Sequence, residues 1–486
     1  MKSLRLIPCL VLVAGCVGTP SVNGVAGTSP APNAAWTPPA TPPETTLAKP
    51  PVAPLPPDVQ KRIDSLGLGD VVDIALSNNP TTQISWANAR AAADAYGAAK
   101  GQYYPQLDLA VDAVNLQTVQ TQGRSAVQQT YVFPNATINW LLLDIGGRSG
   151  SIGAAKNTLI AADWTHNATI QDVVLQVESA LFNYLAARAL LAADSTSVKE
   201  AQTSVDATNE QHKVGLATIA DVLQARTALS QAKLNLQSTQ GDYLTTRGAL
   251  AVSMGLPANI PYDIAPVNVL IPVGILPDSV DTLITQALHA RPDFAAARAQ
   301  YDAALERIRV ARAARLPSLA LSGTGGRTYS SALPSGGNSY TLQLGVSIPV
   351  FAGFSRLYNQ RQAEAEADAA LAQATSIQQQ VIFQVFSSYY TLQTAAGRVH
   401  TADDLLNSAT QTEEVTLGRY KAGVGSILDL LTAQSALASA RAQQIQARLE
   451  WRTALTQLAH DVGVLDTHGQ SPLRTVNDTT GTPPPR

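Results

Sequence analysis

The sequence predicts an internally duplicated α+β membrane protein that combines long helices with four β-strands. Three observations support this fold class: one motif occurs twice, long stretches show a heptad pattern, and short segments alternate apolar and polar residues. The chain has 486 residues, of which 45% are hydrophobic and only 14% charged, whereas ordinary soluble domains contain about 25% charged residues. The net charge is −3 and no run is rich in Lys or Arg, so no nucleic-acid partner is expected.

The amino terminus predicts secretion and a lipid anchor. Lys2 and Arg5 precede an apolar stretch, and the small residues Ala14 and Gly15 lead directly into Cys16. This order of a basic, an apolar and a small-residue region is typical of a secretory signal peptide, here residues 1–15. The cysteine that follows resembles the bacterial lipoprotein box, which implies an acylated Cys16 and sorting to the outer membrane. The alternative is an ordinary signal peptide followed by an incidental cysteine.

Residues 16–57 are predicted to be a tether between the acylated cysteine and the folded body. Twelve of the 29 prolines lie between Val17 and Pro57, mixed with Thr, Ala and Ser. A segment of this composition cannot bury a core and favours an extended chain.

A duplicated motif divides the body into two halves. The pattern K-x-G-x-x-[ST]-x-x-D-[VL]-L-x-A begins at Lys213 and again at Lys421, and Asn79-Pro80 has a counterpart in Arg291-Pro292. Similar composition of two helix hairpins is the alternative explanation. We predict a first repeat at 58–254, a linker at 255–278, a second repeat at 279–463 and a tail at 464–486, since repeats of this length indicate a duplicated domain.

Each repeat is predicted to contain a β-hairpin, at about 104–143 and about 317–350. Leu342, Leu344 and Val346 alternate with Thr341 and Gln343, and the first repeat contains similar segments. Strands of about 9–11 residues with one apolar face are typical of the wall of an outer-membrane barrel. A soluble, half-buried sheet would give the same pattern.

The hairpins are followed by long predicted helices. No proline lies in 149–211 or 355–420, so each helix could extend for about 95 Å at 1.5 Å per residue. Heptad spacing predicts coiled-coil packing. The expected contact positions include Val222, Ala225 and Leu229 in the first repeat and Leu431, Ala438, Ala442, Ile445 and Leu449 in the second.

These motifs, together with the turns Asp144-Ile145-Gly146-Gly147-Arg148 and Phe351-Ala352-Gly353, resemble the TolC-type outer-membrane efflux proteins. The likeness covers about residues 66–463 and points to the lipoprotein branch that serves RND pumps. It implies that three copies form a 12-stranded outer-membrane β-barrel above a coiled-coil α-helical barrel in the periplasm, with an equatorial region at the linker and the tail. Four strands cannot close a barrel, and lipid does not tolerate open edges; the number three rests on the resemblance.

The resemblance also implies the function and its partners. We expect a lipid-anchored channel of the outer membrane that extends into the periplasm, docks on a periplasmic adaptor protein and an inner-membrane pump, and passively exports drugs and other small toxic molecules. Ducts for type I protein secretion or metal export are alternatives within the same architecture. A lipid-anchored coiled-coil scaffold of the envelope is the alternative outside it.

The duplicated turns are the candidate functional residues. Gly215 and Gly423 are expected to end one helix in the left-handed conformation, and Thr218 and Ser426 to cap the next helix. By resemblance these four residues form the adaptor-docking turns.

Two carboxylates and two further residues are the gate candidates. Asp221 and Asp429 would lie at N3, where helix capping alone explains them; rings of these carboxylates at the periplasmic entrance would instead favour cations. The family's gate uses a tyrosine that corresponds to Tyr420, but the accompanying Thr and Arg are absent here. We therefore expect an apolar constriction at Leu428 or a ring of Asp429 rather than a polar latch.

No catalytic residue is predicted. The six histidines form no i,i+4 pair and no H-E-x-x-H motif, so we expect neither a metal site nor an enzyme. The lipid on Cys16 is the only non-protein group expected.

Overall fold

The computed structural model describes residues 66–118, 127–265, 279–330 and 333–465. The predicted signal peptide, the tether with Cys16, most of the linker and nearly all of the tail lie outside the described residues. Within the described ranges, no helix is both long and apolar enough to cross a membrane.

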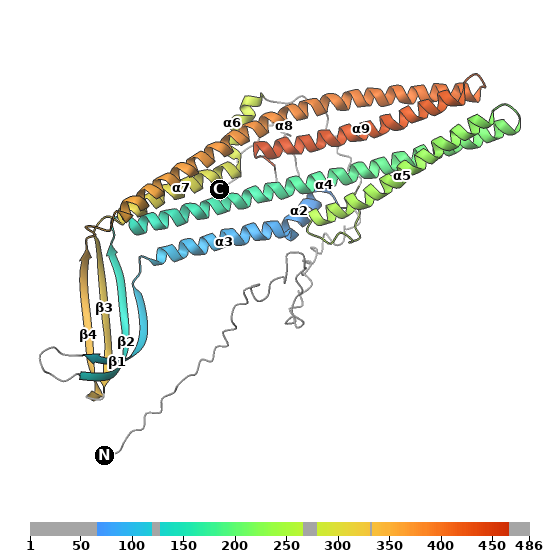
Figure 1. The fold of residues 1–486 in the computed structure, drawn as a ribbon. Helices are drawn as coiled ribbons and strands as arrows, with labels where there is room; N and C mark the ends of the chain where they lie inside the picture. Colours follow the sequence, from blue (N-terminus) through green and yellow to red (C-terminus); the bar gives the residue numbers. More distant parts are fainter. Residues whose placement is uncertain (1–65, 119–126, 266–278, 331–332, 466–486) are drawn as a thin grey trace, which may run out of the picture. The chain divides into compact units, whose positions relative to one another are not determined.

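The internal duplication is visible as two copies of one order of elements (Figure 1). The first half contains α2 (Leu68–Asn78), α3 (Pro80–Gly101), β1 (Gln106–Thr118), β2 (Val127–Leu143), α4 (Gly147–Lys213) and α5 (Ile219–Ser253). The second half contains α6 (Val280–Ala290), α7 (Pro292–Ala313), β3 (Ser318–Ser330), β4 (Leu333–Ser347), α8 (Ser355–Lys421) and α9 (Ile427–Val462). The predicted duplicated α+β fold is therefore confirmed.

Two helices precede each hairpin, α2 and α3 in the first half and α6 and α7 in the second. The break falls at the duplicated dipeptides: Asn79 and Arg291 are extended, with ψ of 125° and 122°, and the prolines that follow them open the next helix. Proline disfavours a helical conformation in the residue before it but fits the first helical position. The N-P and R-P dipeptides thus mark a helix break.

The four strands form one antiparallel sheet in the order β1-β2-β3-β4. Leu109 pairs with Ala136, which pairs with Gly325 and then Tyr340; one residue away, Asp108, Thr137, Thr324 and Thr341 are paired in the same way. Directly paired residues share a face, so one face is apolar and the other polar, as the alternation predicts. The apolar face is uncovered, with Leu109 82% and Leu342 70% exposed.

The passage from strand to long helix uses the same unusual backbone in both halves. Two consecutive residues have positive φ before each helix: Ile145 and Gly146 (45° and 102°) before α4, and Gly353 and Phe354 (58° and 63°) before α8. A β-branched residue rarely adopts this conformation. Next to Ile145, the Asp144 carboxylate accepts a hydrogen bond from the backbone N–H of Arg148. This hydrogen bond fixes the start of α4.

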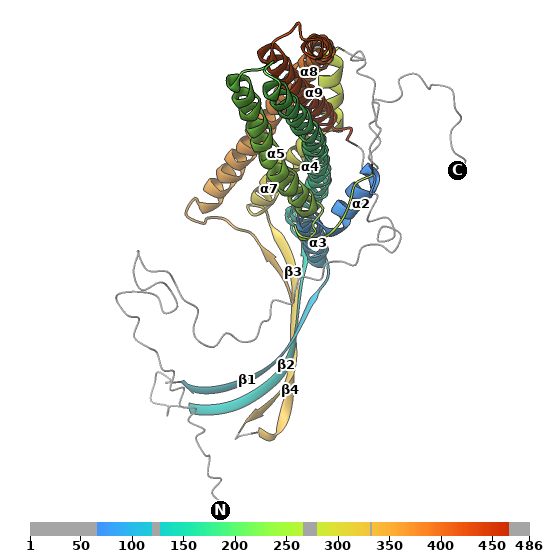
Figure 2. The ribbon, with the colours of Figure 1, turned by 90° about the vertical axis from the view of Figure 1, so that its right-hand side faces the viewer.

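The long helices pair with their successors to form two hairpins, α4–α5 and α8–α9. Both α4 and α8 have 67 residues, or about 100 Å. Figure 2 shows these helices packed side by side, with α4 in contact with both α5 and α9. The predicted contact positions Val222, Ala225 and Leu229 are buried in α5.

The predicted contact positions in α9 are wrong. Leu430, Ala433, Leu437 and Ala440 are buried, whereas Leu431, Ala438, Ala442, Ile445 and Leu449 are only partly buried. Helix α9 packs against both α8 and α4, and alanine occurs on both contacting sides. A heptad pattern with small residues on neighbouring positions therefore fits two alternative registers.

In each half, the glycine that follows the last helix lies against the end of the first helix, α2 or α6. Gly255 and Gly463 follow α5 and α9 with φ of 74° and 81°. A Cβ at Gly255 would lie 2.6 Å from the carbonyl carbon of Asn78, and one at Gly463 would lie 3.0 Å from that of Ala290. Glycine is required at both positions by its φ and by this close approach.

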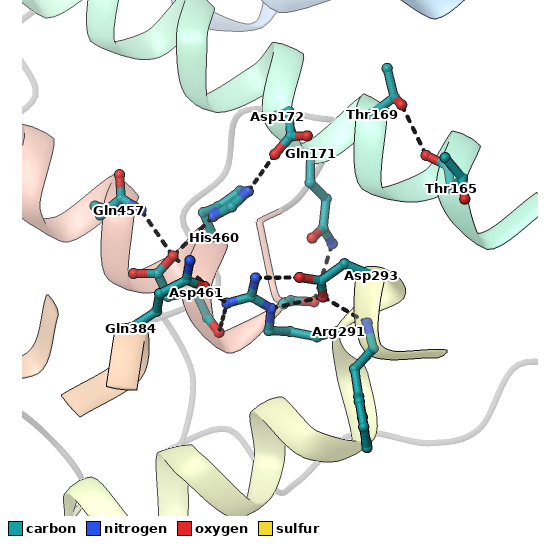
Figure 3. Close-up of polar contacts among 12 residues, drawn as sticks. Thr165, Thr169, Gln171, Asp172, Arg291, Asp293, Gln384, Gln457, His460 and Asp461 are labelled. Atoms are coloured by element: carbon teal, nitrogen blue, oxygen red, sulfur yellow. Dashed lines mark hydrogen bonds and ion pairs between the residues drawn. The ribbon is translucent and has the colours of Figure 1, made fainter. Parts of the chain in front are cut away.

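A partly buried polar cluster joins the two halves near the carboxyl end of α9 (Figure 3). His460 Nε2 lies 2.9 Å from Asp172 Oδ1 of α4, and its Nδ1 lies 3.1 Å from Asp461 Oδ1. Only the imidazolium can donate from both ring nitrogens. Burial lowers the pKa of His460, but the hydrogen bonds and negative charges of the two carboxylates outweigh burial and raise the pKa to about 9.

Arg291 extends this cluster to α7 and α8. Its guanidinium donates to both carboxylate oxygens of Asp293 (2.6 and 3.0 Å) and to Gln384 Oε1 (2.6 Å), and one nitrogen lies 3.9 Å from Asp461 Oδ1. Arg291 is buried, and a buried guanidinium is tolerated because carboxylates and hydrogen bonds surround it.

We predict that thermal stability falls as the pH rises through about 9. A raised pKa means that the folded protein binds a proton more tightly than the unfolded chain, so the contribution is complete below about pH 6.5 and is lost above the folded pKa. The upper limit is about 3 kcal/mol. The thermal midpoint of the purified protein from pH 6 to 10 measures it.

Two histidine variants test this prediction, and the second is the control. His460→Gln should flatten the pH profile in this window, whereas His166→Gln should not, because His166 pairs with the hydroxyl of Ser85 rather than with carboxylates. Equal steepness in wild type and His460→Gln would contradict the prediction.

Candidate functional site

The two tip turns, which join α4 to α5 and α8 to α9, have the same backbone geometry. Gly215 and Gly423 have φ of 77° and 73°, the left-handed conformation that the motif predicts. The backbone N–H of Leu216 donates to Gln211 O (2.8 Å), and that of Val424 to Arg419 O (3.0 Å). These bonds satisfy carbonyls at the helix end that have no partner within the helix.

The next helix is capped in both turns, but the two carboxylates differ. Thr218 Oγ1 accepts from the backbone N–H of Asp221, and the Asp221 carboxylate accepts in return from the backbone N–H (2.7 Å) and the hydroxyl (2.8 Å) of Thr218. These bonds, the backbone bond first, lower the pKa of Asp221. Asp221 is therefore engaged as part of a capping box.

Asp429 makes only half of that arrangement. Its backbone N–H donates to Ser426 Oγ (3.1 Å), but its carboxylate forms no hydrogen bond or ion pair with the described residues and is exposed. Capping thus accounts for the carboxylate of Asp221 and leaves that of Asp429 free to interact with ions.

Tyr420 provides a polar link that the sequence argument did not expect. Its side chain is buried, and its hydroxyl donates to Gln211 Oε1 (2.7 Å) and lies 3.2 Å from Thr208 Oγ1. Both partners belong to α4, so the link joins the second hairpin to the first near the tips. The polar latch that the sequence argument considered uses a Thr and an Arg near the two Asp residues; the partners of Tyr420 are instead Thr208 and Gln211 of α4.

Sequence reasoning missed Thr208 and Gln211. Their only signal is their spacing of three residues on α4, which places both on one helix face. Many polar pairs in the long helices share that spacing, so the sequence alone does not single them out.

Apolar side chains are exposed around both turns. Leu216 is 80% exposed, Leu428 is 58% exposed, and Val214 and Val424 are also exposed. Leu428 is adjacent to Asp429 in the first turn of α9, so an apolar and an acidic side chain are both available there.

The contact between the two hairpins includes an apolar cluster with Val174 of α4 and Ala459 of α9, but towards the tips it is made by polar pairs. Arg441 of α9 forms two bonds of 3.0 Å with Glu200 of α4, and Ser204 donates to Gln434 (3.1 Å). Within each hairpin, by contrast, the contacts form apolar clusters. Polar pairs at a partly exposed interface contribute little stability compared with buried apolar area. The contacts within each hairpin are therefore expected to be stronger than these polar pairs between the hairpins.

Further towards the His460 cluster, Thr456 of α9 donates to the Glu178 carboxylate of α4 (3.0 Å). Burial raises the pKa of Glu178 and this hydrogen bond opposes the rise. No group of three His, Cys, Asp or Glu residues in the described part of the chain is arranged to hold a metal ion. Cys16 lies outside the described residues.

Comparison with known proteins is consistent across sequence and structure. The profile of the outer membrane efflux protein family matches residues 71–256 and 283–464. Protein CyaE of Bordetella pertussis is 29% identical, covering 86% of this chain and 89% of CyaE; the probable efflux pump outer membrane protein TtgC of Pseudomonas putida is 25% identical, covering 82% of each. The CmeC outer membrane channel of Campylobacter jejuni has the same fold, with a TM-score of 0.73 at 19% identity, covering 84% of this chain and 89% of CmeC.

Proposed function

Because this chain belongs to the outer membrane efflux protein family, we propose that it is the outer-membrane duct of a three-part export system for small molecules. The family consists of channel proteins that are located in the outer membrane and extend into the periplasm. The finer assignments, namely the oligomer, the lipid anchor, the partners, the gate and the cargo, are proposals of this section.

One observation carries the proposal: an uncovered apolar sheet continues directly into helices of about 100 Å. Helix α4 begins at Gly147, four residues after β2 ends at Leu143, and runs without interruption to the first tip turn. Because the sheet and the helix are continuous, a sheet that lies in lipid would place the tip turns far away in the periplasm. A scaffold that only spaces envelope layers would not need an apolar sheet.

We propose a homotrimer. In the described sheet, β1 and β4 each pair with one neighbour only, and lipid does not tolerate unpaired edges. Three copies would supply 12 strands, an even number within the range of known barrels.

We propose that acyl chains on Cys16 anchor the assembly to outer-membrane lipid. The small residues before Cys16 and the proline-rich segment after it support an anchor on a flexible tether.

We propose that the tip turns dock on a periplasmic adaptor, which connects the duct to an inner-membrane pump of the RND type. Support comes from the exposed apolar side chains around Gly215 and Gly423, since apolar groups at the end of a long polar hairpin favour a protein partner. Thr218 and Ser426 hold the shape of these turns through their capping bonds.

We propose that Asp429 sets ion preference at the periplasmic entrance and that the Tyr420 link restrains opening. The free Asp429 carboxylates of three copies would form an acidic ring. The Tyr420 hydroxyl holds the second hairpin to the first, where the other contacts are polar, so parting the hairpins would break this link.

The export function is tested by dye accumulation in a deletion strain. Restoring the wild-type gene should lower the accumulation of fluorescent dyes and of a small antibiotic panel, and Cys16→Ala should restore export poorly because the anchor is lost. Cys9→Ala is the matched control, since Cys9 lies within the predicted signal peptide and should have no effect on the mature protein.

Other results would point elsewhere. Unchanged accumulation, with an oligomer still in the outer membrane, would favour protein secretion or metal export. Unchanged accumulation without an oligomer would refute the duct and leave the scaffold.

The gate proposal predicts that Asp429→Asn lowers the cation-to-anion permeability ratio of channels in planar bilayers. A carboxylate about 4 Å from a passing cation contributes roughly 1 kcal/mol in water, or about a fivefold preference. The measurement is the reversal potential in a salt gradient.

Two further variants serve as controls in the same recordings. Asp221→Asn should change the ratio less, because the Asp221 carboxylate is bound to Thr218. Tyr420→Phe should raise conductance without changing the ratio, whereas Tyr389→Phe should do neither. An unaltered ratio in Asp429→Asn would refute the role of Asp429 in ion preference.

The docking proposal predicts that Gly423→Val weakens cross-linking to the adaptor while the oligomer still assembles. Valine is strained at a φ of 73°, so the turn must change shape. Gly397→Val is the control, because Gly397 lies within α8 with open space around it. Normal cross-linking of Gly423→Val would exclude this turn from docking.

A further inference from the structure

A cavity of about 490 Å³ lies where the long helices approach the sheet. Its wall comes from the first two turns of α4, including Ser151, the last turns of α7, including Arg307 and Val310, and the first turns of α8, including Arg356 and Asn359. The residues on α7 recur every three or four positions, so they lie on one face of that helix.

The cavity is positively charged. Arg307 and Arg356 form no hydrogen bond or ion pair with the described residues, whereas Arg309, Arg312 and Arg315 nearby each have a partner on α7 or α8. No acidic residue lines the cavity. The amino-terminal ends of α4 and α8, which carry partial positive charge, lie in this region together with the carboxyl-terminal end of α7, which carries partial negative charge.

The cavity lies at the level where the chain leaves the apolar sheet. Residue 314, in its wall, is four positions before β3 begins at Ser318, and Arg356 is nine positions after β4 ends at Ser347. Exposed aromatic side chains mark the same level: Tyr104 before β1, and Phe351, Phe354 and Tyr358 after β4. Aromatic side chains at the end of an apolar sheet are typical of the boundary between lipid tails and headgroups.

We propose that this cavity binds the phosphate group of a phospholipid in the periplasmic leaflet of the outer membrane. Two guanidinium groups without partners match a phosphate, because each can donate two parallel hydrogen bonds to its oxygens. The neighbouring apolar sheet would hold the acyl chains of the same molecule. The site would fix the depth of the sheet in the membrane independently of the anchor on Cys16.

A phosphate could also come from solution, and the shared chemistry makes inorganic phosphate the competing ligand. A lipid gains affinity from its acyl chains on the apolar face, and inorganic phosphate does not. The lipid should therefore bind far more tightly at this site.

The experiment measures binding of fluorescent phosphatidylglycerol to the purified, delipidated oligomer. The double variant Arg307→Gln/Arg356→Gln should bind it about tenfold more weakly or worse, because it loses two charge-assisted contacts. The matched control is Arg298→Gln/Arg361→Gln, which removes two charges from the same helices α7 and α8. These two side chains lie over Phe294 and Tyr358 rather than in the cavity wall, so binding should be retained.

Several results would overturn the proposal. Equal binding by the wild type and the cavity variant would exclude the site, and an equal loss in the control would indicate a diffuse basic surface. Displacement of the lipid by equimolar inorganic phosphate would assign the site to a free anion. If the Gln variant does not assemble, Arg307→Lys/Arg356→Lys replaces it, and unweakened binding by that variant would exclude paired guanidinium recognition. Dye export by the intact cell tests the duct function separately from lipid binding.

Discussion

The backbone groups at the two edges of a four-stranded sheet need partners once that sheet lies in lipid. Within the described residues, one chain pairs β1 with β2 and β4 with β3 but leaves the outer edge of each open. In the proposed trimer, neighbouring copies would be the partners that repeat the same pairing at both edges. Each long helix follows its strand after a short turn, so the arrangement of strands around a barrel also decides how the helices are arranged beneath it.

The contacts within each hairpin differ in kind from many of the contacts that join the two halves of this chain. Apolar clusters hold α4 to α5 and α8 to α9, and two larger clusters fix α2 and α6 against those hairpins. The two halves meet through charged and polar pairs, from the Tyr420 link near the tips to His460 and Asp172 at the other end of α9, and also through an apolar cluster that includes Val174 of α4 and Ala459 of α9. Near the tips, a displacement between the hairpins therefore exchanges polar partners, for which water is a substitute.

Local features of the sequence predicted local structure well. The glycine, hydroxyl and carboxylate of each turn motif are close in the chain, so their geometry depends on a few adjacent dihedral angles. Alternation predicted β1, β2 and β4 and their two faces clearly, and β3 (Ser318–Ser330) most weakly. The contact register of α9 did not, because alanines on neighbouring positions allow two faces to pack. The partners of Tyr420 and His460 lie 209 and 288 positions away in the chain, and no periodic pattern encodes a contact between single polar residues at that distance.

Duplication has given this chain two copies of a motif with different chemistry. In the first turn the Thr218 hydroxyl donates to the Asp221 carboxylate, whereas in the second turn the carboxylate of Asp429 remains free. A capped helix start needs only the hydroxyl as acceptor, so the carboxylate is available for another role once that bond is made. The same reasoning applies to Arg148 and Arg356, which each follow the strand-to-helix turn of their half: Arg148 binds Asp144 and a backbone carbonyl, while Arg356 has no partner among the described residues. In each pair one side chain stabilises the fold through its hydrogen bonds. The other has no partner among the described residues and is available to bind an ion or a lipid.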